Sequence, residues 1–298
     1  MKKNIIITGA TSFIGLHLID GLIEHGGYNI YAIVRENSNK INRLPKSKIT
    51  VIENSMENFE LLEDKIPQNF YALFHLAWNG THGEDRMNPK MQKDNYLNSL
   101  KLLEVSKKKN CNIFITAGSQ AEYGPHNDKV YETTKEIPNT EYGKYKLKFY
   151  NDAKTFCENN GICLIEPRFF SLYGINDYEN TLIINSIKKM QNNQSMDFTK
   201  GVQLWNYLYI EDAVNALILL MEKEVSGIYN FGSLDTRPLK EFVLEIKRIL
   251  NSTSNLNFGK IQDSGIINVN PSIEKLLNTI EWKPQTTFTE GIRMILRK

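Results

Sequence analysis

Three side chains near the middle of the chain could together move a proton to or from a hydroxyl oxygen. Tyr142 and Lys146 are four residues apart, so they share one face if this stretch is helical. A free tyrosine titrates near about 10, and a fixed ammonium should lower that pKa by favouring the phenolate. Tyr142 would then exchange the proton, while Ser119 holds and polarises the same oxygen. The sequence therefore predicts an acid–base site.

The Tyr-x-x-x-Lys spacing alone is poor support, because it occurs three times. The pairs are Tyr131/Lys135, Tyr142/Lys146 and Tyr150/Lys154. The first pair precedes Pro138 in a turn-rich segment that is unsuited to a helix. The third lies about 12 Å further along the same helix, at ~1.5 Å per residue, away from the strand ends where α/β sheets hold ligands. Only Tyr142 falls in the first helical turn, behind a cap at Asn139 or Thr140.

The elements that would position this site begin at residues 5–15, which read as strand, tight turn and helix. A helix start offers free N–H groups and partial positive charge, so it can bind a pyrophosphate. Gly9 permits the turn and Gly15 lets the helix pack closely, while Ser12 stands where a dinucleotide-binding loop usually has its middle glycine. We take the Ser12 hydroxyl as a phosphate ligand. The predicted loop contacts are Gly9, Thr11, Ser12, Phe13, Ile14 and Gly15.

Arg35 follows the second predicted strand, where such folds meet the adenosine ribose. An acidic residue there binds the hydroxyls of NAD, whereas an arginine accommodates the extra phosphate of NADP. We therefore favour NADP(H) with NAD(H) possible, and a solvated loop arginine is the open alternative.

His75 is expected to be a hydrogen-bonded structural residue, and Asn95 a hydrogen-bonding residue opening the next helix. Further predicted cofactor contacts are Ser55, Met56, Leu76, Ala77, Trp78, Ala117, Tyr142, Lys146 and Phe169.

Composition restricts the class of protein. The 298 residues carry 36 Lys+Arg and 34 Asp+Glu, a net charge of +2, which gives no sign of a nucleic-acid partner. The three cysteines have no metal spacing, so we expect no metal site and a reducing cytoplasm. No stretch approaches the roughly 18 apolar residues of a membrane span.

Strand and helix patterns alternate along the chain. The predicted strands are 29–34, 49–52, 71–76, 113–116 and 163–166, and the predicted helices after the first are 57–66, 91–108 and 141–159. Alternation of this kind predicts an α/β fold with a parallel sheet covered by helices on both faces.

Several short motifs come in a specific order. They are Thr8-Gly9 with Gly15, His75-Leu76-Ala77, Ser119 four residues before Tyr123-Gly124, Tyr142-Gly143 with Lys146, Arg168 to Gly174, Gln203 to Asp212, Ile228 to Ser233, and Glu281-Trp282-Lys283-Pro284. As a set they resemble the extended short-chain dehydrogenases/reductases, the nucleotide-sugar epimerase/dehydratase/reductase family.

This resemblance implies a Rossmann-like, doubly wound NAD(P)-binding domain over residues 1–166, with a returning segment near 203–233. It also implies a smaller α/β substrate-binding lobe over 167–298, with a nucleoside diphosphate sugar in the cleft between the two. The substrate contacts would be Gln120, Ser171, Trp205 and Tyr207.

Departures from the family pattern narrow the reaction. Gln120-Ala121 stand where the 4,6-dehydratases carry an Asp-Glu pair, and neither side chain can act as the acid or base that elimination of water needs, so we reject a dehydratase. Trp205-Asn206 replaces the usual Arg-Asp, so the substrate diphosphate must be held differently. Ser171 replaces a common substrate-contacting asparagine.

Two reactions remain, with a third reading from another class. Arg35 favours an NADPH-dependent reductase of 4-keto-6-deoxy nucleotide sugars, in which Tyr142 protonates the oxygen at carbon 4; residues 257–284 also resemble CDP-abequose synthase-type reductases. The alternative is an NAD-dependent 4-epimerase using the same three residues. A non-catalytic NADP-binding regulator is the third reading, although such relatives usually lose the Tyr/Lys pair.

A homodimer is the last expectation. The predicted helix from Glu141 is apolar over more than half its circumference, beyond the roughly 100° stripe that its own sheet needs. The preceding helix is similarly apolar, and relatives in the family commonly pair these two helices across a two-fold axis. We expect Phe149 to lie in that seam. The open alternative is that the C-terminal lobe covers the extra apolar face within one chain.

Overall fold

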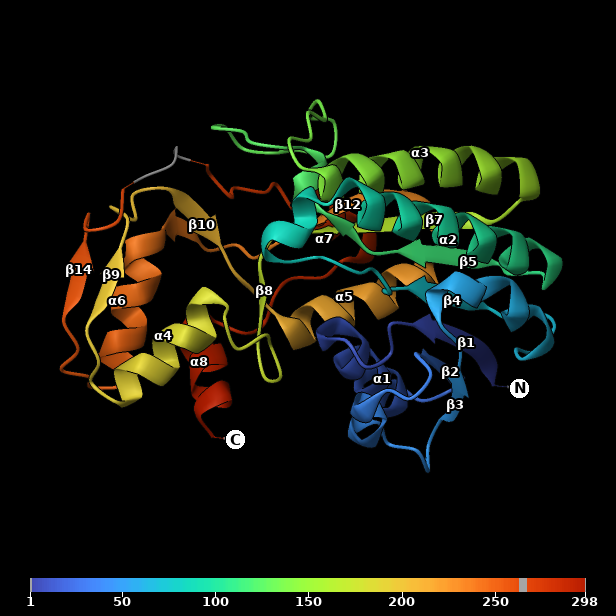
Figure 1. Ribbon diagram of the computed structural model, residues 1–298, viewed down its shortest axis with the longest axis horizontal. Coiled ribbons are helices and arrows are strands. Elements are labelled where there is room, and N and C mark those ends of the chain that lie inside the picture. The colour runs from blue at the N-terminus through green and yellow to red at the C-terminus, as the bar shows by residue number, and fades with distance from the viewer. Residues whose placement is uncertain (1, 263–266, 298) are drawn as a thin grey trace. The chain divides into compact units, whose positions relative to one another are not determined.

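The computed structural model describes residues 2–262 and 267–297, which form two compact units (Figure 1). Unit 1 comprises residues 1–124, 135–169 and 214–229, and unit 2 comprises 125–134, 170–213 and 230–298. The first unit thus extends slightly beyond residue 166 and omits 125–134. Its returning segment, 214–229, is shorter than the 203–233 expected from the sequence.

Unit 1 is built on a sheet with the strand order β3-β2-β1-β4-β5-β7-β12, and β6 pairs with β7. The strands are β1 (Lys3–Thr8), β2 (Tyr28–Val34), β3 (Thr50–Glu53), β4 (Ala72–His75), β5 (Ile113–Thr116), β6 (Gly118–Ser119), β7 (Cys163–Phe169) and β12 (Gly227–Phe231). The pairings from β3 through to β7 are parallel. The order reverses between β1 and β4, which is where doubly wound sheets bind ligands at their carboxyl ends.

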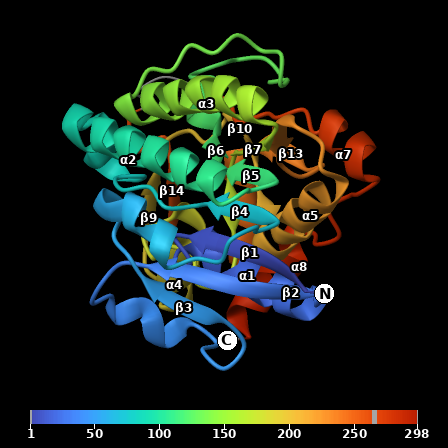
Figure 2. The ribbon, with the colours of Figure 1, turned by 90° about the vertical axis from the view of Figure 1, so that its right-hand side faces the viewer.

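Helices cover both faces of this sheet (Figure 2). α2 (Pro89–Lys108) and α3 (Glu141–Asn160) pack together on one face, and α1 (Phe13–His25) and α5 (Ile210–Lys223) lie on the other. The strands are short apolar runs because they are buried on both faces; Ile6 and Phe114, for example, are fully buried. The predicted α/β fold with a parallel sheet is confirmed.

One predicted helix differs from its expectation. The predicted helix 57–66 overlaps the 3₁₀ helix η2 (Met56–Asp64), which has a non-helical Asn58 in its interior. The Asn54 side chain donates to the Asn58 carbonyl at 2.9 Å, so this carbonyl has a side-chain partner at the break in the helix. Asn95 does not open α2, which begins at Pro89 behind the cap residue Asn88.

Unit 2 contains short strand pairs and four helices among its described residues. β8 (Leu172–Tyr173) pairs with β11 (Leu208–Tyr209), β9 (Met196–Phe198) with β14 (Leu256–Phe258), and β10 (Leu204–Asn206) with β13 (Thr236–Pro238). The helices are α4 (Leu182–Gln191), α6 (Leu239–Ile249), α7 (Glu274–Ile280) and α8 (Phe288–Leu296). Tyr173, Tyr207, Phe242 and Phe288 form an aromatic cluster with ring centroids 4.8–5.9 Å apart.

Candidate active site

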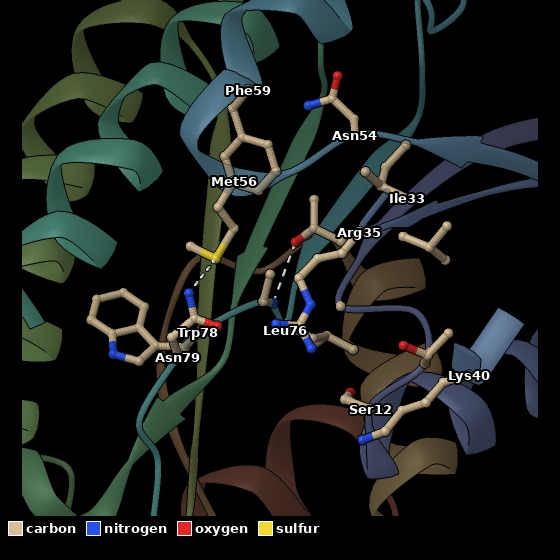
Figure 3. A pocket seen from close by; sticks show the side chains of 15 residues that line it. Ser12, Ile33, Arg35, Lys40, Asn54, Met56, Phe59, Leu76, Trp78 and Asn79 are labelled. Carbon is tan, nitrogen blue, oxygen red and sulfur yellow. Dashed lines mark hydrogen bonds between the residues drawn. The ribbon is translucent and has the colours of Figure 1, made fainter. Parts of the chain in front are cut away.

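A cavity of about 230 Å³ lies at the carboxyl ends of β1, β2, β3 and β4 (Figure 3). Its lining includes eight of the predicted cofactor contacts, namely Gly9, Thr11, Ser12, Arg35, Met56, Leu76, Ala77 and Trp78. Because this is the point where the strand order reverses, the cavity has the position of a dinucleotide site in a doubly wound sheet.

The backbone around Gly9 has no room for a side chain. Gly9 has a φ of +69°, and a Cβ there would lie 2.7 Å from the Ala77 nitrogen. A Cβ on Gly15 would lie 2.4 Å from the Gly9 carbonyl oxygen. The turn after β1, the start of α1 and the loop after β4 are therefore in close backbone contact, and the roles expected for both glycines are confirmed.

Ser12 is the N-cap of α1, and its hydroxyl accepts from the Gly15 N–H at 3.1 Å. This bond satisfies one of the four free N–H groups of the helix start and leaves the first turn of α1 beside the cavity. No acidic residue lies in that turn. The helix N-terminus therefore suits an anion such as a pyrophosphate.

Two exposed cations line the cavity at its β2 side (Figure 3). Arg35 follows β2 directly, as the sequence predicted, and Lys40 comes from the 3₁₀ helix η1 (Asn39–Arg43), whose cap is Ser38. Among the described residues that line the cavity there is no aspartate or glutamate. Sequence reasoning missed Lys40, because only the short helix after β2 returns it to the cavity.

Several predicted contacts do not line this cavity. They are Phe13, Ile14, Gly15, Ser55, Ala117, Tyr142, Lys146 and Phe169, whereas Thr8, Ile33, Val34, Lys40, Asn54, Phe59 and Asn79 line it without having been predicted. The missed residues are mostly strand ends and the residues next to predicted ones. Alternation along a strand does not reveal which of its last residues face a ligand, so the sequence carried little signal for them.

Buried polar residues hold the floor of the cavity in place. His75 is fully buried and hydrogen-bonded at 2.8 Å to both Thr8 and Ser99, and burial lowers its pKa to about 3, so it is neutral. Asn95 accepts from the Asn79 N–H at 3.1 Å and donates to the Asn79 carbonyl at 2.8 Å. Both residues have the structural role that the sequence indicated.

The predicted acid–base residues come together in unit 1. Thr140 caps α3 by accepting from the Gly143 N–H at 3.0 Å, which resolves the choice between Asn139 and Thr140. The Tyr142 phenol is hydrogen-bonded to the Ser119 hydroxyl. Lys146 Nζ donates to the Ala117 carbonyl at 2.7 Å, lies 3.9 Å from the centre of the Trp78 ring and 6.0 Å from that of Tyr142.

The direction expected for the pKa of Tyr142 is wrong. Burial raises that pKa to about 12, and the bond from Ser119 opposes the rise without reversing it. Burial also lowers the pKa of Lys146 to about 8. Desolvation disfavours the charged form of each group, and here it outweighs the attraction that the spacing suggested. At neutral pH the phenol is therefore protonated and ready to donate.

Arg86 is a neighbour of Tyr142 that the sequence did not reveal. It comes from the 3₁₀ helix η3 (Gly83–Met87), and its guanidinium carbon lies 4.9 Å from the centre of the Tyr142 ring. This cation lowers the pKa of Tyr142, although less than burial raises it. Its buried Nε has no hydrogen-bond partner among the described residues. No motif marks this arginine, because the fold alone brings it to the tyrosine.

The other two Tyr/Lys pairs are placed as expected. Tyr131 is 45% exposed in a turn, and Tyr150 is buried with its ring 5.7 Å from the Arg168 guanidinium. Of these three tyrosines, Tyr142 is the one that is hydrogen-bonded to Ser119.

The predicted substrate contacts belong to both units. Gln120 begins the 3₁₀ helix η4 (Gln120–Glu122) directly after Ser119 in unit 1. In unit 2, Trp205 and Tyr207 have ring centroids 6.3 Å apart, and the Ser171 carbonyl accepts from the Leu208 N–H at 2.9 Å. The buried Trp205 Nε1 has no hydrogen-bond partner within the part of the chain that the structure describes.

Phe149 does not lie in a helix–helix seam on the surface. It is 1% exposed, and its ring packs against His75, Trp78 and Phe114. Much of the apolar circumference of α3 is therefore used inside unit 1. On α2, Leu97 is 44% exposed.

Among the described residues, no group of His, Cys, Asp and Glu side chains could hold a metal ion. None of the helices that the structure describes is long and apolar enough to cross a membrane.

Comparison with known proteins agrees with this geometry. The sequence profile of the NAD dependent epimerase/dehydratase family matches residues 5–232. CDP-abequose synthase of Salmonella muenchen is 29% identical, with 99% of this chain and 98% of the relative covered. The UDP-N-acetylglucosamine 4-epimerase of Methanobrevibacter ruminantium M1 superposes with a TM-score of 0.89 at 25% identity, covering 100% of this chain and 98% of the other. The Bacillus cereus UDP-glucuronic acid 4-epimerase in complex with NAD shares the fold, with a TM-score of 0.85 at 21% identity over 99% and 96% of the chains.

Proposed function

Because this chain belongs to the NAD dependent epimerase/dehydratase family and is an NAD(P)-dependent enzyme of the nucleotide-sugar type, we propose that it reduces a 4-keto-6-deoxy nucleotide sugar with NADPH. The observation that carries this proposal is the pair of cations at the cavity, Arg35 and Lys40, with no carboxylate in the described lining. A ribose 2′-phosphate carries about two negative charges and suits such a site, whereas a free ribose hydroxyl is usually bound by an acidic residue.

The cavity residues suit the dinucleotide. The start of α1 would hold the pyrophosphate, and Arg35 would contact the 2′-phosphate. When bound there, NADPH would supply the hydride for carbon 4.

The residues of the chain supply the proton. Tyr142 is protonated at neutral pH because burial raises its pKa to about 12, so it donates its proton to the oxygen at carbon 4. Ser119 holds that oxygen through its hydroxyl. The Lys146 ammonium offsets the charge left on the phenolate and keeps the Ala117 carbonyl in place.

The test compares cofactors and sugars together. Purified protein is titrated with NADPH and with NADH, then incubated with 4-keto-6-deoxy sugars on CDP, UDP and dTDP carriers. We expect tighter binding of NADPH and loss of its absorbance with one of the ketosugars. Conversion of a UDP-hexose to its 4-epimer with no net change in NADPH would contradict the proposal.

The alternative is an NAD-dependent nucleotide-sugar 4-epimerase. It is favoured by the similarity of the fold to that of 4-epimerases, one of them in complex with NAD. The same three residues would serve, but Tyr142 would first have to lose its own proton before it could remove one during oxidation and return it during reduction. Tightly held NAD in the purified protein supports the epimerase, and an empty site that fills with added NADPH supports the reductase.

We also propose that unit 2 binds the sugar nucleotide through Ser171, Trp205 and Tyr207, with Gln120 contacting the sugar from unit 1. The unpartnered Trp205 N–H is the group best suited to donate to a ligand oxygen. Trp205→Phe removes that donor and keeps an aromatic ring, although a smaller one. A rise in KM for the sugar with unchanged affinity for NADPH is the expected result, and an unchanged KM would contradict it.

We also propose a homodimer through α2 and α3. Because Phe149 is buried inside unit 1, the test mutates a surface residue instead. Leu97→Glu puts a charge on the exposed face of α2, where it should shift a dimer to monomer in light scattering. Leu234→Glu is the control, because Leu234 is 67% exposed and lies outside both helices. A wild-type protein that is monomeric at micromolar concentration excludes this dimer.

A further inference from the structure

Directly behind Ser119 lies a buried cluster of charged side chains that the proposed chemistry does not use. Arg168 on β7 is fully buried and contacts three carboxyl groups, those of Glu122 at 3.3 Å, Glu136 at 2.9 Å and Glu166 at 2.9 Å. Glu122 and Glu166 are also at most 1% exposed, whereas the Glu136 side chain is 33% exposed. Burying charges costs several kcal/mol per ion unless they are paired, so this cluster calls for an explanation.

The cluster is attached to the backbone that carries the proton-transfer site. The Ser119 N–H donates to Glu122 at 2.7 Å, and the Ser119 side chain and Glu122 together form a capping box around η4. A Cβ on Gly118 would lie 2.7 Å from Glu166 Cγ, so β6 packs against that side chain. On the other side, Lys146 holds the Ala117 carbonyl. Residues 117–119 are therefore held between Lys146 and the two glutamates.

Arg168 faces three carboxyl groups, so its single positive charge cannot neutralise all of them if all three are ionised. The groups facing the pair are Arg168 from β7, Lys146, Tyr142 and Tyr150 from α3, Tyr123, and Glu136, which contacts the same Arg168 nitrogen as Glu122. Glu136 already takes part of the Arg168 charge. Two adjacent buried carboxylates repel each other, and such pairs commonly retain one proton between them.

Burial and mutual repulsion act in the same direction on both groups. Burial raises the pKa of Glu122, and burial followed by the charge of Glu122 raises that of Glu166 further. The buried Glu122 Oε2 has no hydrogen-bond partner among the described residues, so it can accept a hydrogen bond from Glu166. Since Glu122 already accepts from Ser119, Glu166 is the natural donor in the bond between them.

We propose that Glu122 and Glu166 share one proton at neutral pH and act as a positioning pair, which anchors the Ser119 backbone and fixes the negative charge that Lys146 and Tyr142 experience. This inference rests on the proposed proton transfer at Tyr142 for its catalytic meaning. The shared proton itself is independent of the substrate. The pair carries a single negative charge, paired with Arg168.

Infrared difference spectra test the shared proton without any substrate. Wild-type protein at neutral pH should show the carbonyl band of a buried, protonated carboxylic acid, and both Glu122→Gln and Glu166→Gln should lose it, because the glutamate that remains pairs with Arg168 and ionises. Glu136→Gln is the matched control, since it also removes a carboxylate from Arg168 and should keep the band. Absence of the band from the wild type overturns the proposal.

The pH profile of kcat/KM tests the effect on the triad. The alkaline limb should stay at its wild-type position in each single variant, because each retains one negative charge. In Glu122→Gln/Glu166→Gln that charge is lost, and the limb should move down by roughly one pH unit. If each single variant already moves the limb by about half of the double variant's shift, both carboxylates are ionised and the proposal is wrong.

The anchoring of Ser119 is tested by rescue. Glu122→Ala removes the acceptor for the Ser119 N–H and should lower kcat with little change in KM, whereas Glu122→Gln keeps an acceptor oxygen and should recover most of kcat. Equal losses in both would contradict the anchoring role. If the double variant does not fold, the single variants still decide through the infrared band. If no sugar is turned over, the proposed function fails while the band still tests the proton.

Discussion

The cavity at the carboxyl ends of the strands and the cluster of Ser119, Tyr142 and Lys146 lie in the same unit, yet their charged groups differ in exposure. Arg35 and Lys40 are exposed side chains that line the cavity, and they can meet an incoming phosphate directly. Tyr142 and Lys146 are at most 9% exposed. Burial raises the pKa of Tyr142 and lowers that of Lys146, and both shifts favour the neutral form of the side chain. Ligand binding at the cavity depends on contacts that form when the ligand arrives. The protonation states of Tyr142 and Lys146 are already determined by desolvation in the folded protein.

The difference teaches where each kind of change should act. An exposed cation contributes to binding only the free energy of its contact with the ligand, and salt weakens this contact by screening. A buried group is coupled to its neighbours, so its protonation depends on residues that never touch a ligand. Variants of the cavity should therefore change cofactor affinity, and variants of the buried site should change turnover and its pH dependence.

The largest effect should come from Tyr142→Phe. Removing the phenol removes the proton donor, so we expect kcat to fall by about 10² or more while NADPH affinity stays near the wild-type value. Tyr131→Phe is the control, because Tyr131 is 45% exposed in a turn and should leave kcat unchanged. A similar loss in both variants would mean that the proton comes from elsewhere or that the fold is disturbed.

Arg35→Asp should have the next largest effect, and on affinity alone. A charge-assisted contact is worth about 1.5–3 kcal/mol, so NADPH should bind roughly 10- to 100-fold more weakly while NADH changes little. Arg43→Asp makes the same charge change at an exposed residue outside the cavity lining and should leave both affinities unchanged. If the two cofactors weaken in parallel, Arg35 does not contact the 2′-phosphate.

The pH dependence should follow Lys146 before Tyr142. With the Lys146 pKa lowered to about 8 and that of Tyr142 raised to about 12, kcat/KM should fall roughly tenfold per pH unit above about pH 8. An alkaline limb near pH 10 would contradict the burial of Lys146. The effect of Lys146 on stability has the opposite dependence on pH. The unfolded lysine keeps its proton to about pH 10.5, whereas the folded one loses it near pH 8. The free energy of unfolding should therefore rise between about pH 8 and 10.5 because of this group.

The smallest effect should come from Arg86→Ala. Loss of the cation next to the Tyr142 ring raises the pKa of that phenol further and removes an interaction of about 0.5–1 kcal/mol, so kcat should fall about two- to fivefold. Arg86→Lys keeps the charge and should recover part of the loss. If Arg86→Ala raises the KM for the sugar more than it lowers kcat, Arg86 contacts the substrate instead.

Much of unit 1 was predictable because its signals are local. The strand 113–116 was predicted with its observed bounds, and the capped start of α3 at Thr140 was one of two candidates. Gly9 and Gly15 were assigned from the turn and helix that they join, and the close backbone contacts confirm both. These features follow from spacing, capping and backbone conformation, which a short stretch of sequence contains.

The sequence by itself determined the α/β fold with its parallel sheet, the glycine turn after β1, and the pairing of Tyr142 with Lys146 on one face of α3. Each depends on residues close together in the chain. Only the tertiary structure decided that Lys40 reaches the cavity, that Arg86 lies over Tyr142, and that Phe149 belongs to the core. It also decided the protonation of the buried groups, because desolvation depends on what surrounds a side chain in space, and no spacing along the chain specifies that environment.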